Sequence, residues 1–255
     1  MATDSTERRA RLGIATYAVL LLITAVAWAH VLWTMLTDDM AGMDMVLTPT
    51  LADGMAFVAA WATMMAAMML PSALPMIALY GATQRGERRA APVGLFTLVY
   101  LVLWAATGVP MYLVSVALSG VAAPARAYAI AVMLIVAGAF QLSALKRVCL
   151  RRCRSPLGFL LGHWREGWRG SLALGWSHAL YCLGCCWALM LVLVGAGAMG
   201  LAWVLLVAAV VAAEKVLTGG EWIARATGVG LVLLGVAVAV RPGLALALRG
   251  VAPTP

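Results

Sequence analysis

The chain has 255 residues, of which 64% are hydrophobic and 11% charged, and its formal net charge is +8. This composition excludes an ordinary water-soluble domain, and the long unbroken apolar runs favour transmembrane helices over a β-barrel. The positive charge does not indicate nucleic-acid binding, because basic residues in a membrane protein mostly mark its cytoplasmic loops. Arginine far outnumbers lysine, as in proteins of GC-rich bacteria. We therefore predict a single all-α, multi-pass domain in the lipid bilayer of a bacterial cytoplasmic (inner) membrane.

Seven apolar segments approach the ~20 residues that a helix needs to cross a bilayer. The last two are the weakest, since the sixth ends in Glu214 and Lys215 and the seventh begins in a polar stretch, so six spans are an alternative. With the N-terminus inside, 15 of the 18 Lys and Arg residues fall in cytoplasmic segments, as the positive-inside rule requires. The expected spans are about 12–36, 54–80, 93–118, 127–145, 171–194, 201–216 and 222–240.

The first segment is expected to be a retained span and not a cleaved signal peptide, because its apolar run continues through Leu36. His30 near its outer end is expected to be interfacial and not a ligand. The outer loop that follows mixes carboxylates with thioethers, which suits the capture of a soft cation. An ordinary solvated loop is the alternative. The candidate residues in this loop are Met40, Met43, Asp44 and Met45.

The second span carries paired methionines ahead of two prolines, Pro71 and Pro75. Thioethers are soft, neutral ligands that suit Cu(I). Plain packing by adaptable side chains is the alternative. The prolines interrupt the hydrogen-bond ladder of the helix, so they indicate a kink, a hinge or a free carbonyl ligand. The candidate ligands are Met64, Met65, Met68 and Met69.

Cys149 and Cys153 follow the fourth span in a strongly basic stretch. If the helix continues there, the two thiols lie one turn apart on one face. The flanking Arg residues are expected to lower the pKa of both thiols. We predict a second metal or redox site at the cytoplasmic end, with incidental thiols in a lipid anchor as the alternative.

The fifth span provides the strongest motif, because His178, Cys182, Cys185 and Cys186 occur within nine residues. A helix turns about 100° per residue, so the first three fall within roughly a 60° arc and Cys186 lies at its edge. By count these residues reach mid-membrane, where imidazole and thiolate suit Cu(I) or zinc. Cys182 and Cys185 also form a Cys-x-x-Cys pair, which predicts disulfide exchange as an alternative. Packed small hydrophobic side chains are the third interpretation.

Glu214 lies inside the sixth span, next to Lys215. A buried carboxylate needs a partner, which we expect in the fifth-span cluster or a proton path, unless the span ends earlier and Glu214 is interfacial. Lys215 is expected to extend to the inner surface.

The chain resembles a bacterial family of predicted metal-binding integral membrane proteins, the domain of unknown function 2182. The resemblance covers about residues 61–214. It rests on the paired methionines from Met64, the stretch from Gln141 through both inner cysteines, the His178 to Cys186 tract, and the Glu214–Lys215 pair. The family implies metal binding, without a settled metal, direction or reaction.

We therefore expect a soft-metal protein that translocates or delivers copper, with zinc as the alternative metal. The outer loop would gather cations, the second span would pass them to the fifth, and Cys149 and Cys153 would release them inside. Partners would be a membrane cuproenzyme or a periplasmic metal carrier. The alternatives are a membrane thiol oxidoreductase that uses Cys182 and Cys185, and a non-catalytic assembly subunit. A retinal receptor is excluded, because neither Lys146 nor Lys215 is central in a last helix.

Overall fold

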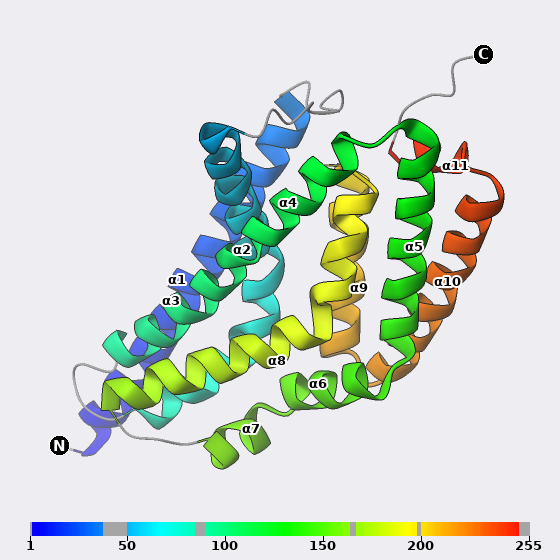
Figure 1. Ribbon diagram of the computed structural model, residues 1–255. Coiled ribbons are helices and arrows are strands. Elements are labelled where there is room, and N and C mark those ends of the chain that lie inside the picture. Colours follow the sequence, from blue (N-terminus) through cyan, green and yellow to red (C-terminus); the bar gives the residue numbers. More distant parts are fainter. Residues whose placement is uncertain (1, 38–49, 85–89, 164–166, 198–199, 250–255) are drawn as a thin grey trace.

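The computed structural model describes residues 2–37, 50–84, 90–163, 167–197 and 200–249, and within these ranges the regular structure is entirely helical (Figure 1). The predicted all-α fold is therefore confirmed for the described residues. The helices are α1 (Ala2–Thr37), α2 (Leu51–Thr83), α3 (Ala90–Ala106), α4 (Gly108–Ser119), α5 (Ala123–Leu142), α6 (Ala144–Arg154), α7 (Pro156–His163), α8 (Gly167–Gly195), α9 (Leu201–Val216), α10 (Gly220–Val240) and α11 (Leu244–Leu248).

Six helical segments of the described chain are long and apolar enough to cross a membrane, which indicates a multi-pass membrane protein. They are Tyr17–Thr37, Leu51–Thr83, Ala90–Ser119, Ala123–Leu142, Gly167–Gly195 and Gly220–Val240.

The seventh expected span, 201–216, is α9, which has only 16 residues. At 1.5 Å per residue it is about 24 Å long, less than the ~30 Å thickness of a hydrocarbon core, so it is not among the six candidate spans. It nevertheless runs from one end of the bundle to the other, because Trp203 near its start donates to the Leu248 carbonyl of α11 and Arg154 of α6 donates to the Leu217 carbonyl at its end. The fourth expected span is also too long, because α5 ends at Leu142. Ser143 is extended and its side chain accepts a hydrogen bond from the Lys146 amide, which caps α6 and turns the chain aside.

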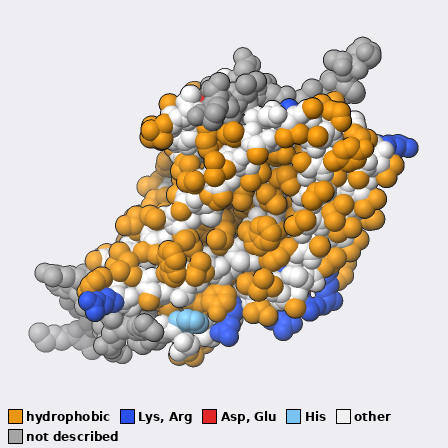
Figure 2. Space-filling view, in the orientation of Figure 1, with side chains coloured by type: hydrophobic (Ala, Val, Ile, Leu, Met, Phe, Trp, Pro, Cys, Tyr) orange, Lys and Arg blue, Asp and Glu red, His pale blue; other side chains and the backbone are white. Residues whose placement is uncertain are grey.

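The outer surface of the bundle is apolar at mid-height and basic at one end. Leu22, Leu98 and Leu233 are 63%, 57% and 64% exposed, as lipid-facing side chains would be. Figure 2 shows hydrophobic side chains across the middle of the visible face and most of its Lys and Arg side chains along the lower edge, where α6 and α7 lie in Figure 1. This distribution agrees with the expected cytoplasmic position of the basic loops.

Close helix packing depends on glycine where α5 meets α10, which run side by side in Figure 1. A Cβ added at Gly138 on α5 would lie 2.6 Å from the Gly228 carbonyl oxygen on α10. A Cβ at Gly235 would lie 2.9 Å from the Ala131 carbonyl oxygen. Without a hydrophobic driving force between helices in lipid, such close backbone approach supplies much of their attraction. The glycines therefore hold the α5–α10 pair together.

Replacing Gly138 with Ala should force α5 and α10 apart and lower the free energy of unfolding by about 1–3 kcal/mol, the usual cost of overpacking. Gly230→Ala on α10 is the matched control, because no heavy atom lies within 4 Å of its added Cβ. Unfolding of both variants in mixed micelles, followed by circular dichroism, measures the difference. Equal stability of the two variants would contradict the packing role of Gly138.

Candidate functional site

Four of the five cysteines gather where α6, α8 and α9 meet. The Cys185 Sγ lies 3.2 Å from the Cys186 Sγ and 3.8 Å from the Cys153 Sγ. Cys182 is close enough to interact with the other three thiols. All are free thiols, and the three on α8 are only 1% exposed. We call Cys153, Cys182, Cys185 and Cys186 the thiol cluster.

The cluster lies level with the ends of several helices. Lys215, which bonds to Cys182, stands in the last turn of α9, and Cys153 is near the end of α6. On α8 itself the cysteines stand near the middle of the helix, and α6 packs against α8 beside them. The cluster therefore faces the basic end of the bundle.

A buried ion pair fastens α6 to α8 and α9. The Lys146 Nζ lies 2.6 Å from a Glu214 carboxylate oxygen and donates a 2.5 Å hydrogen bond to the Cys185 carbonyl. Gln141 Nε2 donates to the other Glu214 oxygen at 2.7 Å. Lys146 and Glu214 are 0% and 1% exposed. Glu214 therefore has the partner that its burial demanded, and that partner is Lys146 and not a side chain of the thiol cluster.

Gly184 lets α6 approach α8 closely, because an added Cβ would lie 2.8 Å from the Cys149 Sγ. The fourth-span helix does not itself continue, because α5 ends at Leu142, but Cys149 and Cys153 lie one turn apart on the separate helix α6 and have different surroundings. Cys149 packs against Gly184, whereas Cys153 joins the thiol cluster. The two therefore do not form a separate inner pair.

The Arg residues around these two thiols were expected to lower their pKa, and that expectation is wrong. Burial raises the pKa of Cys149, although the charge of Lys146 opposes the shift in part. The hydrogen-bonding contact with the Cys182 thiol holds the pKa of Cys153 well above its ordinary value. Arg151 and Arg152 are exposed to solvent, and Arg154 donates a hydrogen bond to the Leu217 carbonyl. The three guanidinium groups therefore do not stabilise a thiolate at Cys149 or Cys153.

Lys215 lies over the thiol cluster and does not extend to the inner surface as expected. Its Nζ donates hydrogen bonds to the Cys182 Sγ and the Ser72 Oγ, each at 3.0 Å. The same nitrogen lies 3.9 Å from the Met69 Sδ. The nearby sulfur and hydroxyl acceptors hold the ammonium inward.

The methionine helix reaches the cluster through Met69. Tyr100 on α3 connects the two, because its hydroxyl lies 3.1 Å from the Cys182 Sγ and donates to the Met69 carbonyl at 3.3 Å. Met64, Met65 and Met68 are buried on the same helix, at 2%, 0% and 5% exposure. Helix α2 continues through Pro71 and Pro75. The two sulfur-rich segments therefore meet at the Met69 end of the methionine run.

His178 lies one turn before Cys182 and packs among the rings of Phe96, Tyr100 and Phe159. Its side chain is 4% exposed, and its Nδ1 has no hydrogen-bond partner within the described ranges. A buried ring nitrogen without a partner is costly, which keeps His178 a candidate ligand. In this conformation, however, no three His, Cys, Asp or Glu side chains of the described chain are arranged to hold a metal ion.

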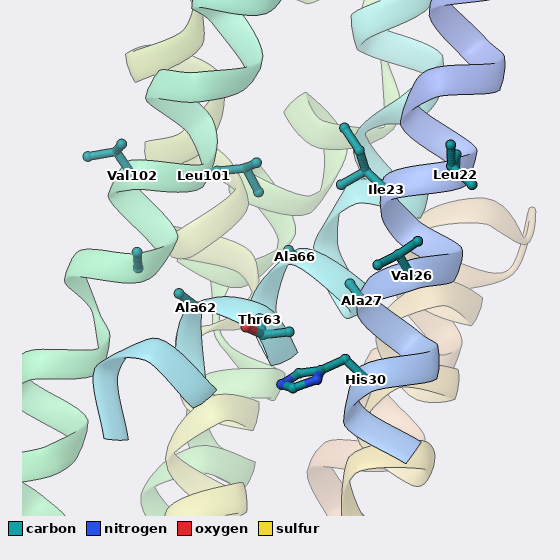
Figure 3. A pocket seen from close by; sticks show the side chains of 11 residues that line it. Leu22, Ile23, Val26, Ala27, His30, Ala62, Thr63, Ala66, Leu101 and Val102 are labelled. Carbon is teal, nitrogen blue, oxygen red and sulfur yellow. The ribbon is translucent and has the colours of Figure 1, made fainter. Parts of the chain in front are cut away.

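The outer-loop candidates Met40, Met43, Asp44 and Met45 lie outside the described residues. His30 is exposed and lines an apolar groove of about 700 Å³ between α1, α2 and α3 (Figure 3). Its neighbours there are alkyl side chains and Thr63, so the described lining offers it no fellow metal ligand. His30 therefore lies apart from the thiol cluster, on the lipid-facing side of α1 and α2.

Sequence reasoning missed four residues of the site: Gln141, Lys146, Tyr100 and Ser72. For Lys146 a signal was available, since a buried Glu214 requires a counter-charge and the chain has only two lysines. No sequence pattern pointed to Tyr100, because an aromatic residue in a transmembrane helix is ordinary. Ser72 lies on the same face of the second span as Met65 and Met68, but that spacing did not indicate a contact with Lys215. Their roles come from helix adjacency.

Replacing Lys146 with Met should leave the Glu214 charge buried and unpaired, and lower the free energy of unfolding by about 3–5 kcal/mol. Pairing it with Glu214→Gln should recover most of that loss, because both charges are then absent. Arg151→Ala, which breaks the exposed pair with Glu221, is the control and should change stability little. Micellar unfolding curves test all three, and a double variant no more stable than the single one would refute the pairing.

A family model described as the PpoB2 copper chaperone matches residues 58–238. No curated protein and no solved structure matches the chain. The match spans α2 to α10 and so includes the thiol cluster, Lys215 and the buried ion pair. The sequence resemblance implied a metal without specifying it, and the family match indicates that this metal is copper. Because it covers well over half of the sequence, this protein belongs to the PpoB2 copper chaperone family.

Proposed function

We propose that the thiol cluster binds Cu(I) as cargo and that the protein delivers the ion to a partner at or in the membrane. Membership of a copper chaperone family supports copper handling. The single observation that carries the site assignment is the convergence of four free thiols from two helices. Thiolates and thioethers are the ligands that select Cu(I).

The spacing of the sulfurs suits a shared ion. Two sulfurs that bind one ion at about 2.3 Å with tetrahedral angles lie roughly 3.8 Å apart. The Cys153 and Cys185 Sγ atoms are 3.8 Å apart, whereas Cys185 and Cys186 are closer, at 3.2 Å. Binding through Cys153, Cys182 and Cys185 would require these side chains to rotate until all three sulfurs face one ion, because the described chain does not hold them so in this conformation. Cys186 and His178 are the remaining candidate ligands of the same ion.

The methionines of α2 are proposed to form the approach to this site. Met64, Met65, Met68 and Met69 are buried, neutral and soft, so they can pass Cu(I) without the cost of burying a counter-charge. The outer-loop residues Met40, Met43, Asp44 and Met45 would collect the ion first, and Cys153, on a helix outside the spans, would release it. A membrane cuproenzyme or a periplasmic metal carrier would be the partner.

Copper is favoured over zinc and over disulfide exchange. A structural zinc site takes four nitrogen, thiolate or carboxylate ligands and gains nothing from a thioether, yet the Met69 sulfur lies near the same Lys215 nitrogen that bonds to Cys182. A disulfide oxidoreductase through Cys182 and Cys185 would not need Cys153, which comes from another helix to join them.

Anaerobic loading with Cu(I), followed by elemental analysis, should give about one copper per chain. Cys182→Ser combined with Cys185→Ser should lose it, because two sulfur ligands disappear. X-ray absorption of the loaded wild type should show a shell dominated by sulfur.

Cys149→Ser is the matched control, because Cys149 is buried on α6 but lies against Gly184, outside the cluster. This variant should retain its copper. Retention of copper by the double variant, or its absence from the wild type, would refute the proposal. A reversible Cys182–Cys185 disulfide in a protein without copper, detected by alkylation and mass spectrometry, would establish the oxidoreductase alternative.

A further inference from the structure

The Lys215 ammonium is hydrogen-bonded to a sulfur that serves as a ligand in the proposed copper site. Its Nζ donates a hydrogen bond to the Cys182 Sγ at 3.0 Å. A metal ion bound by Cys182 would use the same sulfur lone pairs. One cation therefore has to leave before the other can bind.

We propose that Lys215 is a displaceable internal cation, which holds the copper-free site closed and moves out when Cu(I) binds. The inference rests on the proposed function. It assigns to Lys215 the control of copper affinity, a role separate from that of the sulfur ligands.

The surroundings of Lys215 allow both positions. Inward, it is held by the Ser72 hydroxyl at 3.0 Å and by Cys182, with the Met69 thioether at 3.9 Å. Outward, it needs only a rotation of its four-carbon stem. Lys215 is the second-last residue of α9, its side chain is only partly buried, and the helix ends at the basic edge of the bundle. Lysines near helix ends commonly extend to the membrane surface.

The exchange of the two cations itself conserves charge, because ammonium and Cu(I) each carry one positive charge. Each thiol that binds Cu(I) as a thiolate also releases one proton to solvent. In an apolar interior an extra uncompensated charge is costly. Glu214, the adjacent carboxylate, is already paired with Lys146, so it does not compete for Lys215.

Removal of the ammonium should tighten copper binding. Lys215→Leu destabilises only the copper-free state, which loses a charged hydrogen bond, so the Kd for Cu(I) should fall about ten- to a hundredfold. The Kd of each purified variant is measured by competition with a chromophoric Cu(I) chelator. Lys215→Arg should keep the Kd near that of the wild type. Ser72→Ala, which removes an acceptor of Lys215 but no sulfur, should tighten binding by a smaller factor and covers the case in which Lys215→Leu does not fold.

A second measurement follows the movement itself. The chain has two lysines, and Lys146 is fully buried. A membrane-impermeant amine reagent should modify Lys215 more after Cu(I) loading, while Lys146 stays unmodified as an internal reference. Mass spectrometry of the peptides locates the labels.

The outcomes separate this inference from the proposed function. If wild type binds Cu(I) but Lys215→Leu and Ser72→Ala leave the Kd unchanged or raise it, the displacement is refuted and the copper site stands. Unchanged labelling of Lys215 on loading refutes it as well. If the wild type binds no Cu(I), both proposals fail together.

Discussion

The buried ion pair between Lys146 and Glu214 is the interaction on which the candidate site depends. Both side chains are removed from water, so neither charge is tolerable without the other. Because Lys146 also donates to the Cys185 carbonyl, the pair joins α6 to α8 as well as to α9. Cys153 reaches the other thiols only while α6 is held in this place. A charge interaction thus assembles a sulfur site without supplying any of its ligands.

The two lysines of the chain have different surroundings and different roles. Lys146 is fully buried, forms a fixed pair and gives α6 its position. Lys215 is partly exposed, stands at the end of α9, and contacts a sulfur and a hydroxyl instead of a carboxylate. The first is therefore structural, and the second is free to take part in an exchange. The adjacent residues Glu214 and Lys215 point to different partners because neighbouring positions on a helix do not share a face.

Aromatic side chains surround the soft ligands of the site and keep them buried. Tyr100 connects the Cys182 sulfur with the Met69 carbonyl, and Phe96 and Phe159 pack against His178. These contacts leave the thiols buried yet beside the end of the bundle, close to the basic edge. Such a position suits an ion that has to enter and leave, since a cargo site needs a short path to a partner.

Composition and local pattern were enough to determine the class of fold. Apolar runs near span length, together with the distribution of Arg and Lys, predicted a helical membrane protein, because lipid requires every backbone polar group to be satisfied within a helix. The 100° turn of a helix placed Cys182, Cys185 and Cys186 on one side of α8, and sulfur chemistry pointed to a soft metal. The positions of helix ends were harder to predict from the sequence. Helix α5 ends at Leu142, because the Ser143 side chain caps the next helix.

Only the tertiary structure decided which helices meet. No count along the chain places Cys153 with the α8 thiols while Cys149, one turn away on the same helix, packs against Gly184. The same holds for Lys146 with Glu214, which are 68 residues apart, and for Lys215 with Cys182, which are 33 apart. Periodicity reports the face on which a side chain lies, but the partner opposite that face depends on the close packing of other helices. Local sequence therefore determined the ligands that this protein carries, and the packing of the bundle determined which of them share a site.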